Sequence, residues 1–220
     1  MNLDVVLLVA AFVYFPIVVL TLFAYAKRIK VMRFICKPLL MPALAVLYAL
    51  AANKPNLWIF LALGFGWIGD VFLLGRHHWN QLGGIASFAL GHIAYITGMM
   101  LTKPGLRLVG LISVAWVAIC LLVARRFLLP RMPKRLRLPG TIYCALLSCT
   151  CASALYLAIV TGEAAYVLCA CGGLLFIISD GLLAYDMFGK KTTLGNTFVM
   201  VTYILAQTAL VTGFVIHGGI

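Results

Sequence analysis

The sequence predicts an all-α membrane protein with eight transmembrane helices. Of its 220 residues, 65% are hydrophobic and only 10% are charged. Apolar runs of close to twenty residues, about the length that a helix needs to cross the hydrocarbon core, recur along the whole chain. No long polar or Gly/Ser-rich linker divides the sequence. We therefore expect a single polytopic membrane domain over residues 1–220.

Turn-forming and charged residues separate the apolar runs of the first half. The breaks are Lys27-Arg28-Ile29-Lys30, Asn53-Lys54-Pro55-Asn56 and Arg76-His77-His78. We expect the first run to be a span and not a secretory signal, because its start carries no cation and its apolar stretch is too long. The spans predicted here are 2–26, 34–52, 57–75 and 79–101.

The second half follows the same pattern. Its breaks are Lys103-Pro104-Gly105, a loop from Pro130 to Pro139, Thr161-Gly162-Glu163 and Gly189-Lys190-Lys191. The predicted spans are 106–128, 140–160, 163–185 and 194–217. Connections this short force neighbouring spans to run antiparallel. Glu163, at the start of a span, is expected to complement the dipole of its helix.

The distribution of cations predicts the orientation in the membrane. Most of the 17 Lys and Arg residues lie in the connections after the first, third, fifth and seventh spans. By the positive-inside rule, the N- and C-termini then face away from the cytoplasm. The net charge of +12 reflects topology and anionic lipid headgroups, not a nucleic-acid surface. Short connections and no targeting segment favour a bacterial inner membrane, or the endoplasmic reticulum in a eukaryote.

All seven cysteines lie within predicted spans. Because no pair lies in an extramembrane loop, we expect no disulfide framework and treat the thiols as small buried hydrophobic groups. They are Cys36, Cys120, Cys144, Cys149, Cys151, Cys169 and Cys171.

Two aspartates, Asp70 and Asp180, interrupt long apolar runs. A carboxylate in hydrocarbon is costly, so each is a candidate functional residue. The predicted topology puts both about 8 to 9 Å inside the cytoplasmic boundary. Tyr143 and Lys37 fall in the same layer. Lys37 either extends to the interface or pairs with a carboxylate or a lipid phosphate.

A second polar layer is expected deeper in the membrane. His92 and Tyr95 share one helical face, as do Tyr203 and Gln207. Interhelical hydrogen bonds are the simpler explanation for these residues. With a single intramembrane histidine, a three-histidine zinc site is not expected, and no cofactor is required.

The two aspartates are 110 positions apart, half the chain. Alignment at this offset matches few other residues, among them Leu73 with Leu183. It suggests two parallel four-helix repeats.

These residues together resemble the YhhN-like family, called TMEM86 in animals, which includes the lysoplasmalogenases. The resemblance covers nearly the whole chain and the eight-span layout. It implies hydrolysis of the vinyl ether bond of lysoplasmalogens, with Asp70 and Asp180 as the catalytic pair. The matching residues are Lys37-Pro38, Gly69-Asp70, Gly91-His92 with Tyr95, Ser179-Asp180, and Tyr203 with Gln207.

Vinyl ether hydrolysis needs an acid to protonate carbon and an anion or base to assist water. Two adjacent carboxyls in a low-dielectric pocket do not both ionise easily, so the pair is expected to hold a proton. Glycosidases use paired carboxyls against a comparable cation. On this hypothesis Lys37 holds the phosphate, and Tyr143, Tyr203 and Gln207 orient the headgroup or water. Three alternatives remain: aspartates that only fix helix packing, a transporter or proton-coupled carrier, and a zinc-dependent lipid hydrolase similar to alkaline ceramidases.

Overall fold

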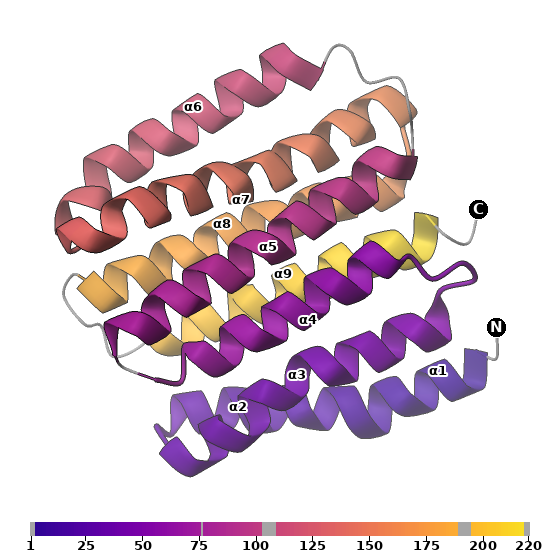
Figure 1. Cartoon of the computed structure of the whole chain (residues 1–220). Coiled ribbons are helices and arrows are strands. Elements are labelled where there is room, and N and C mark those ends of the chain that lie inside the picture. The colour runs from indigo at the N-terminus through magenta and orange to yellow at the C-terminus, as the bar shows by residue number, and fades with distance from the viewer. Residues whose placement is uncertain (1–2, 76, 103–108, 189–194, 218–220) are drawn as a thin grey trace.

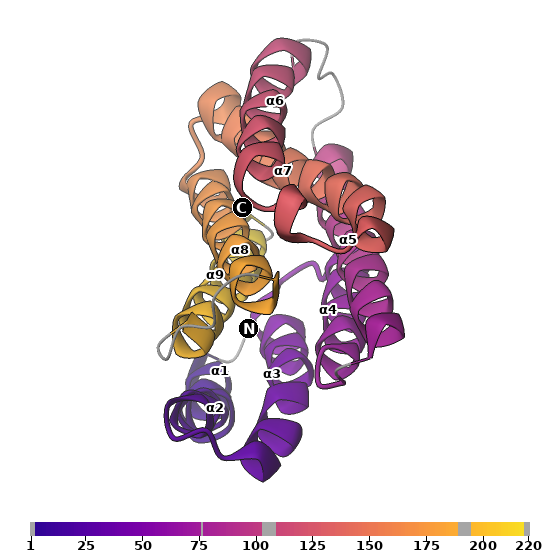
Figure 2. The same ribbon diagram turned by 90° about the vertical axis from the view of Figure 1, so that its left-hand side faces the viewer.

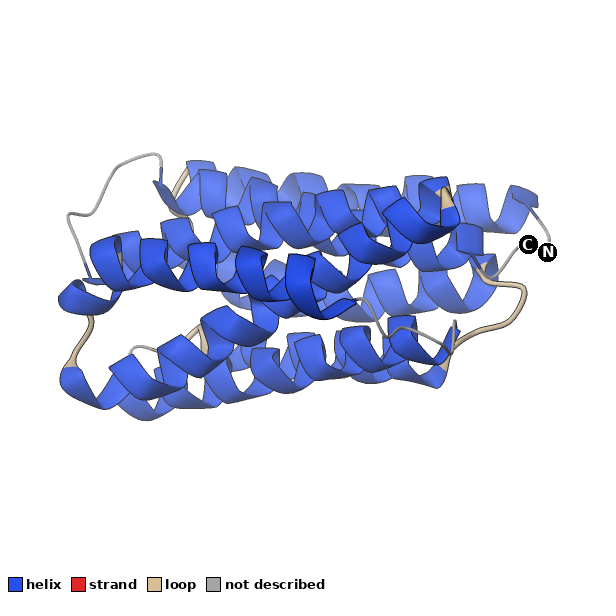
Figure 3. Cartoon of the chain, turned by 90° about the horizontal axis from the view of Figure 1, so that it is seen from above, coloured by secondary structure: helices blue, strands red, loops and turns tan. Residues whose placement is uncertain are grey.

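The computed structural model describes residues 3–75, 77–102, 109–188 and 195–217. Every regular element in these ranges is helical, as predicted (Figure 3). η1 is a π-helical segment and η2 is a 3₁₀ turn. The elements are α1 (Leu3–Val9), η1 (Ala10–Tyr14), α2 (Phe15–Ala26), α3 (Lys30–Ala51), α4 (Leu57–Phe72), α5 (His78–Thr102), α6 (Val109–Phe127), η2 (Leu129–Arg131), α7 (Lys134–Thr161), α8 (Ala164–Phe188) and α9 (Gly195–His217).

Six helical stretches in the described part of the chain are long and apolar enough to cross a membrane. α4 is apolar but shorter, at 16 residues. The chain is therefore a multi-pass membrane protein, whereas eight spans, the two repeats and the orientation remain predictions. The six stretches are Asp4–Ala26, Lys30–Ala51, His78–Leu101, Lys134–Thr161, Ala164–Phe188 and Asn196–His217.

Several predicted boundaries were wrong because charged residues and prolines do not end these helices. α7 begins at Lys134, so the predicted loop up to Pro139 is largely helical. α3 begins at Lys30, four residues earlier than expected, and contains two prolines. Proline is tolerated in membrane helices where neighbouring groups satisfy the freed backbone. The predicted breaks at 103–105 and 189–191 lie outside the described residues.

The helices lie side by side in a bundle (Figure 1). α8 packs between α7 and α9, and α4 packs along α5. α6 lies against α7 at one edge, while α2 lies at the opposite edge against α3 and α9 (Figure 2). α1, η1 and α2 follow one another without a break, and Tyr14 of η1 hydrogen-bonds Thr208 of α9 at 2.6 Å.

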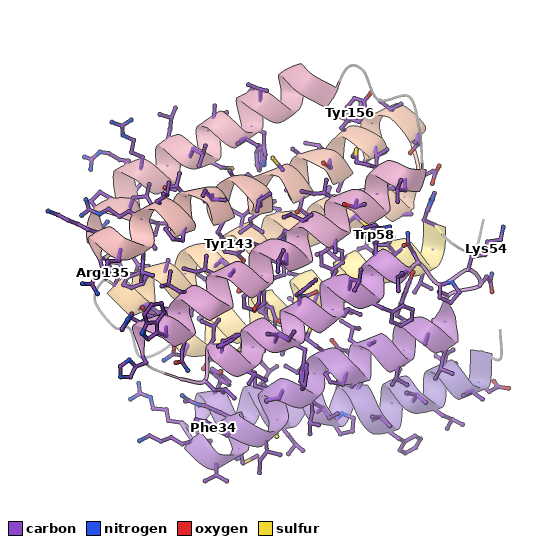
Figure 4. The ribbon with its side chains drawn as sticks, viewed as in Figure 1. Phe34, Lys54, Trp58, Arg135, Tyr143 and Tyr156 are labelled. Carbon is purple, nitrogen blue, oxygen red and sulfur yellow. The ribbon has the colours of Figure 1, made fainter. Side chains whose placement is uncertain are left out.

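Both described chain ends lie at the same end of the bundle (Figure 1). α2 passes into α3, and α6 into α7, at the other end, where most of the described cations gather. We call it the basic end and define it by Lys27, Arg28, Lys30, Lys134 and Arg135. Figure 4 shows Arg135 and Phe34 at this end, and Lys54 and Trp58 at the far end.

Close helix contacts bring the polar residues together. A Cβ added at Gly173 of α8 would lie 2.8 Å from Cys151 Cα of α7, so glycine permits this approach. A Cβ at Gly69 of α4 would lie 2.7 Å from the ring of Phe88 on α5. All seven cysteines are free thiols. The prediction that they are buried is right for only some of them, since Cys171 of α8 is exposed.

Candidate active site

Asp70 lies near the end of α4 and is enclosed by the bundle, with 1% of its surface exposed. Lys37 of α3 places its Nζ 3.2 Å from Asp70 Oδ1. Tyr203 of α9 donates a 2.7 Å hydrogen bond to Asp70 Oδ2. Three helices therefore supply the carboxylate and its two partners. Of the two partners expected for Lys37, the structure shows the carboxylate.

Asp180 lies on α8 and is only partly buried. Its Oδ2 accepts a hydrogen bond from the hydroxyl of Tyr143, which α7 carries one helix away. Figure 4 shows Tyr143 inward from the basic end, between Arg135 and Tyr156 along α7. No cation pairs with Asp180 among the described residues, so the two aspartates have different surroundings.

Both aspartates line one polar cavity of about 680 Å³. Its wall includes Lys37 and the two preceding cations of α3, Lys30 and Arg33, as well as Asp186 of α8. The prediction that two distant apolar runs bring their acids to one site is consistent with this lining. Lys37 joins them in the same wall, as expected from its depth.

An apolar cavity of about 290 Å³ adjoins the polar one. α5, α6, α7 and α8 supply most of its lining, which includes Cys120, Cys144 and Tyr143. The two cavities share part of their walls: Leu73, Gln81, Phe88, Asp180, Leu183 and Met187. Asp180 is the only ionisable side chain in this shared set. It therefore faces both an apolar and a polar space.

The deeper polar layer is a set of interhelical contacts. Tyr95 of α5 donates a 2.7 Å hydrogen bond to Gln207 of α9. His92 Nδ1 lies 3.1 Å from Thr150 Oγ1 of α7, while its Nε2 has no hydrogen-bond partner among the described residues. The His92 ring packs against Tyr143, with centroids 5.8 Å apart. The three predicted residues of this layer, His92, Tyr95 and Gln207, line neither cavity, and the His92 ring supports Tyr143, which contacts Asp180.

Tyr203 bridges the two layers. It was expected deeper than the aspartates, yet its hydroxyl reaches Asp70, and its ring packs edge-on against Phe88 and Phe176. Because these rings are buried and interlocked, they hold the tyrosine hydroxyl in one direction.

The basic wall of α3, formed by Lys30, Arg33 and Lys37, was not predicted. Lys30 and Arg33 were assigned to the connection between spans and read only as topology signals. The signal was present in their spacing, since positions 30, 33 and 37 fall on one helical face once the helix begins at Lys30.

Metal ligation is not favoured by the arrangement of donors. Within the described ranges, no three His, Cys, Asp or Glu side chains lie together in a way that would hold an ion. The chemistry that the site can perform with its own residues is proton transfer by two carboxyl groups in unlike surroundings.

The sequence model of the YhhN family matches residues 32–214. A mouse protein named lysoplasmalogenase TMEM86B is 29% identical over 179 residues, which are 80% of this chain and 71% of the relative. A bovine protein named lysoplasmalogenase TMEM86A is 29% identical over 152 residues, 68% of this chain and 61% of the relative. No solved structure matches the chain.

Proposed function

The chain belongs to the YhhN family, and we propose that it hydrolyses the vinyl ether bond of lysoplasmalogens. The substrates are lysoplasmenyl-ethanolamine and lysoplasmenyl-choline, and the products are a fatty aldehyde and a glycerophospho-base. The observation that carries the proposal is the position of Asp180 on the wall shared by the polar and the apolar cavity.

A lysoplasmalogen has the same division as the two cavities. Its hydrocarbon chain suits the apolar cavity of α5 to α8, and its charged headgroup suits the polar cavity beside α3. The vinyl ether joins these two parts of the lipid. Bound in this way, the lipid presents its reactive bond to Asp180.

The unlike surroundings of the aspartates support a division of roles. Asp70 is paired with Lys37 at 3.2 Å, which favours the carboxylate form and suits a base. Asp180 faces apolar side chains on one side and accepts a hydrogen bond from Tyr143. We assign Asp180 as the acid that protonates carbon and Asp70 as the base that activates water.

The reaction then balances without an added cofactor. Asp180 gives its proton to the β-carbon of the vinyl ether, and the α-carbon becomes an oxocarbenium ion. Water attacks this carbon and loses a proton to Asp70, forming a hemiacetal. The hemiacetal hydroxyl returns a proton to Asp180, and Asp70 protonates the glycerol oxygen as the carbon–oxygen bond breaks. Both carboxyl groups end in their starting states.

The other predicted site residues have supporting roles in this proposal. Lys37 neutralises Asp70, while Tyr143 and Tyr203 orient the two carboxyl groups. Two hydrogen bonds join α5 to the helices that carry these tyrosines: His92 with Thr150 of α7, and Tyr95 with Gln207 of α9. The cation distribution supports a site that faces the cytoplasmic leaflet.

Aldehyde release by the purified full chain tests the proposal. Lysoplasmenyl-ethanolamine should yield free aldehyde at a rate that a metal chelator leaves unchanged. Asp70→Asn and Asp180→Asn should each lower the rate by about 100-fold or more. Asp4→Asn, an exposed acid at the far end, is the matched control and should retain full activity.

Three results would contradict it. Full activity in either aspartate variant would refute the catalytic pair. Loss of activity with a chelator would favour a zinc hydrolase. Flux of protons or substrate into liposomes without aldehyde release would favour a transporter, since paired intramembrane acids also serve that function.

A further inference from the structure

The first turns of α3 carry a basic wall of which the proposed chemistry uses only Lys37. Lys30, Arg33 and Lys37 all line the polar cavity, and their spacing of three and four residues puts them on one helical face. Lys37 forms an ion pair with Asp70. Within the described ranges, neither Lys30 nor Arg33 forms an ion pair, so this part of the wall presents uncompensated positive charge to the cavity.

Arg33 is held in place by the end of α2. Its Nε donates to the carbonyl of Ala24 at 3.2 Å, and its Nη2 donates to the carbonyl of Tyr25 at 3.0 Å. The guanidinium also lies over the Tyr25 ring, 4.6 Å from the centroid. A side chain fixed by three contacts loses little further entropy when it binds a ligand. Its remaining N–H groups, including those of Nη1, have no acceptor among the described residues.

We propose that Arg33 and Lys30 form the binding subsite for the phosphate of a lysophospholipid headgroup. This inference rests on the proposed function, because it names the part of the substrate that the polar cavity recognises. A guanidinium presents parallel N–H groups that match two phosphate oxygens, and the lysine ammonium adds a second cation without geometric constraint. The start of α3 adds the positive end of a helix dipole.

The spacing along α3 fits the length of the substrate. Arg33 precedes Lys37 by four residues, which is about 6 Å along a helix. Lys37 marks the level of Asp70. In a lysophospholipid, the glycerol carbons separate the ether oxygen from the phosphate by a similar length. A lipid with its ether near the aspartates therefore reaches Arg33 with its phosphate.

The cavity wall carries three cations, all on α3, and three acids, on α4 and α8, so positive charge is concentrated beside α3. Asp70 is already neutralised by Lys37, whereas Asp180 and Asp186 lie on α8, a different wall from Lys30 and Arg33. The phosphate thus meets two cations on α3, one of them fixed in direction. In this proposal Arg33 and Lys30 bind the phosphate, whereas the sequence suggested Lys37 as the phosphate ligand.

Binding of ether lipids that lack the vinyl group tests the subsite without any hydrolysis. The full chain in nanodiscs is titrated with 1-O-hexadecyl-lysophosphoethanolamine and with 1-O-hexadecylglycerol, which has no phosphate. The wild type should bind the phosphorylated lipid about 10- to 100-fold more tightly. Arg33→Gln should remove most of this preference, and Arg33→Lys should restore part of it.

Lys30→Gln is the second variant, because Arg33 also supports the turn between α2 and α3. Lys30 makes no comparable bonds to the chain, so its loss should reduce the preference about 3- to 10-fold with the fold intact. Lys27→Gln is the matched control: this exposed cation lies at the same end but does not line the cavity, and the preference should stay unchanged.

Equal affinity of the wild type for both lipids would overturn the subsite, as would an unchanged preference in both Arg33→Gln and Lys30→Gln. Inorganic phosphate binding as tightly as the lysolipid would also overturn it, since the site would then serve a free anion. Arg33-dependent lipid binding without aldehyde release from lysoplasmenyl-ethanolamine would refute only the proposed reaction. Aldehyde release with Arg33-independent binding would refute only the subsite.

Discussion

Lys37 and Asp70 form an ion pair of 3.2 Å in which the two side chains are only 8% and 1% exposed. Each charge is stable at this depth because the other is present, and the Tyr203 hydroxyl satisfies a further lone pair of the carboxylate. Charge in the interior of this bundle is thus matched locally at Asp70. At Asp180 the hydrogen-bond partner is the hydroxyl of Tyr143.

Removing one member of this pair should destabilise the fold. Lys37→Met and Asp70→Asn should each lower the free energy of unfolding by about 3 to 5 kcal/mol, because an uncompensated charge stays buried. The double variant should be more stable than the sum of the two losses predicts. Unfolding in detergent measures this. Lys54→Met, an exposed control at the far end, should change stability by less than about 0.5 kcal/mol. Additive losses would show that the pair is not coupled.

The two tyrosines that contact the aspartates should differ in importance. Tyr143→Phe removes the hydrogen bond to Asp180, so kcat for aldehyde release should fall about 10-fold or more. Tyr203→Phe should have a smaller effect on kcat, because Asp70 keeps its contact with Lys37. Steady-state kinetics of the two variants gives the comparison. A Tyr143→Phe enzyme with unchanged kcat would mean that Asp180 needs no positioning by this hydroxyl.

Two glycines of α8 provide a matched test of helix packing. Gly173→Ala would bring a methyl group within 2.8 Å of the Cys151 backbone, so we expect a loss of about 1 to 3 kcal/mol in stability. At Gly181 an added Cβ meets nothing within 4 Å, and Gly181→Ala should be neutral or slightly stabilising. Thermal unfolding of both variants measures this difference in stability. Equal stability of the two would show that α7 and α8 are not in close contact at Gly173.

The apolar cavity should set the preferred chain length of the substrate. Ala184 lines this cavity but not the polar one, and Ala184→Phe would fill part of its 290 Å³. Turnover of long-chain lysoplasmalogens should fall relative to short-chain ones. Ile178→Phe, on the outer surface of the same helix, is the control and should leave the profile unchanged. An identical profile in Ala184→Phe would place the hydrocarbon chain elsewhere.

Part of the site could be predicted because hydrophobicity dictates it. An aspartate in an apolar run must find a polar partner, and antiparallel spans bring residues of similar depth together. Asp70, Asp180, Lys37 and Tyr143 were expected in one layer for this reason, and the structure brings them close together. Their partners could not be assigned, because the rotation of each helix about its axis depends on side-chain packing. The contacts of Tyr143 with Asp180 and of Lys37 with Asp70 therefore depend on how several helices pack together, which the sequence of one span does not determine.

The missed part has a different physical cause. Lys30 and Arg33 resemble ordinary interfacial cations, and Pro139 resembles a helix end. In the structure the helices continue beyond their apolar runs, since basic side chains at a membrane boundary remain solvated while the backbone stays helical. The spans predicted from apolar length are therefore shorter than α3 and α7, and the basic wall of the cavity was not predicted.

The wall shared by the two cavities bears on the direction of the reaction. If the vinyl ether is cut at Asp180, the fragments belong to different phases: the aldehyde partitions into the bilayer, and the glycerophospho-base dissolves in water. In the proposed binding mode, each fragment would already lie on the side of the shared wall that resembles its final solvent. Departure in opposite directions separates the products at once. Dilution into two phases would then oppose recombination and draw hydrolysis forward.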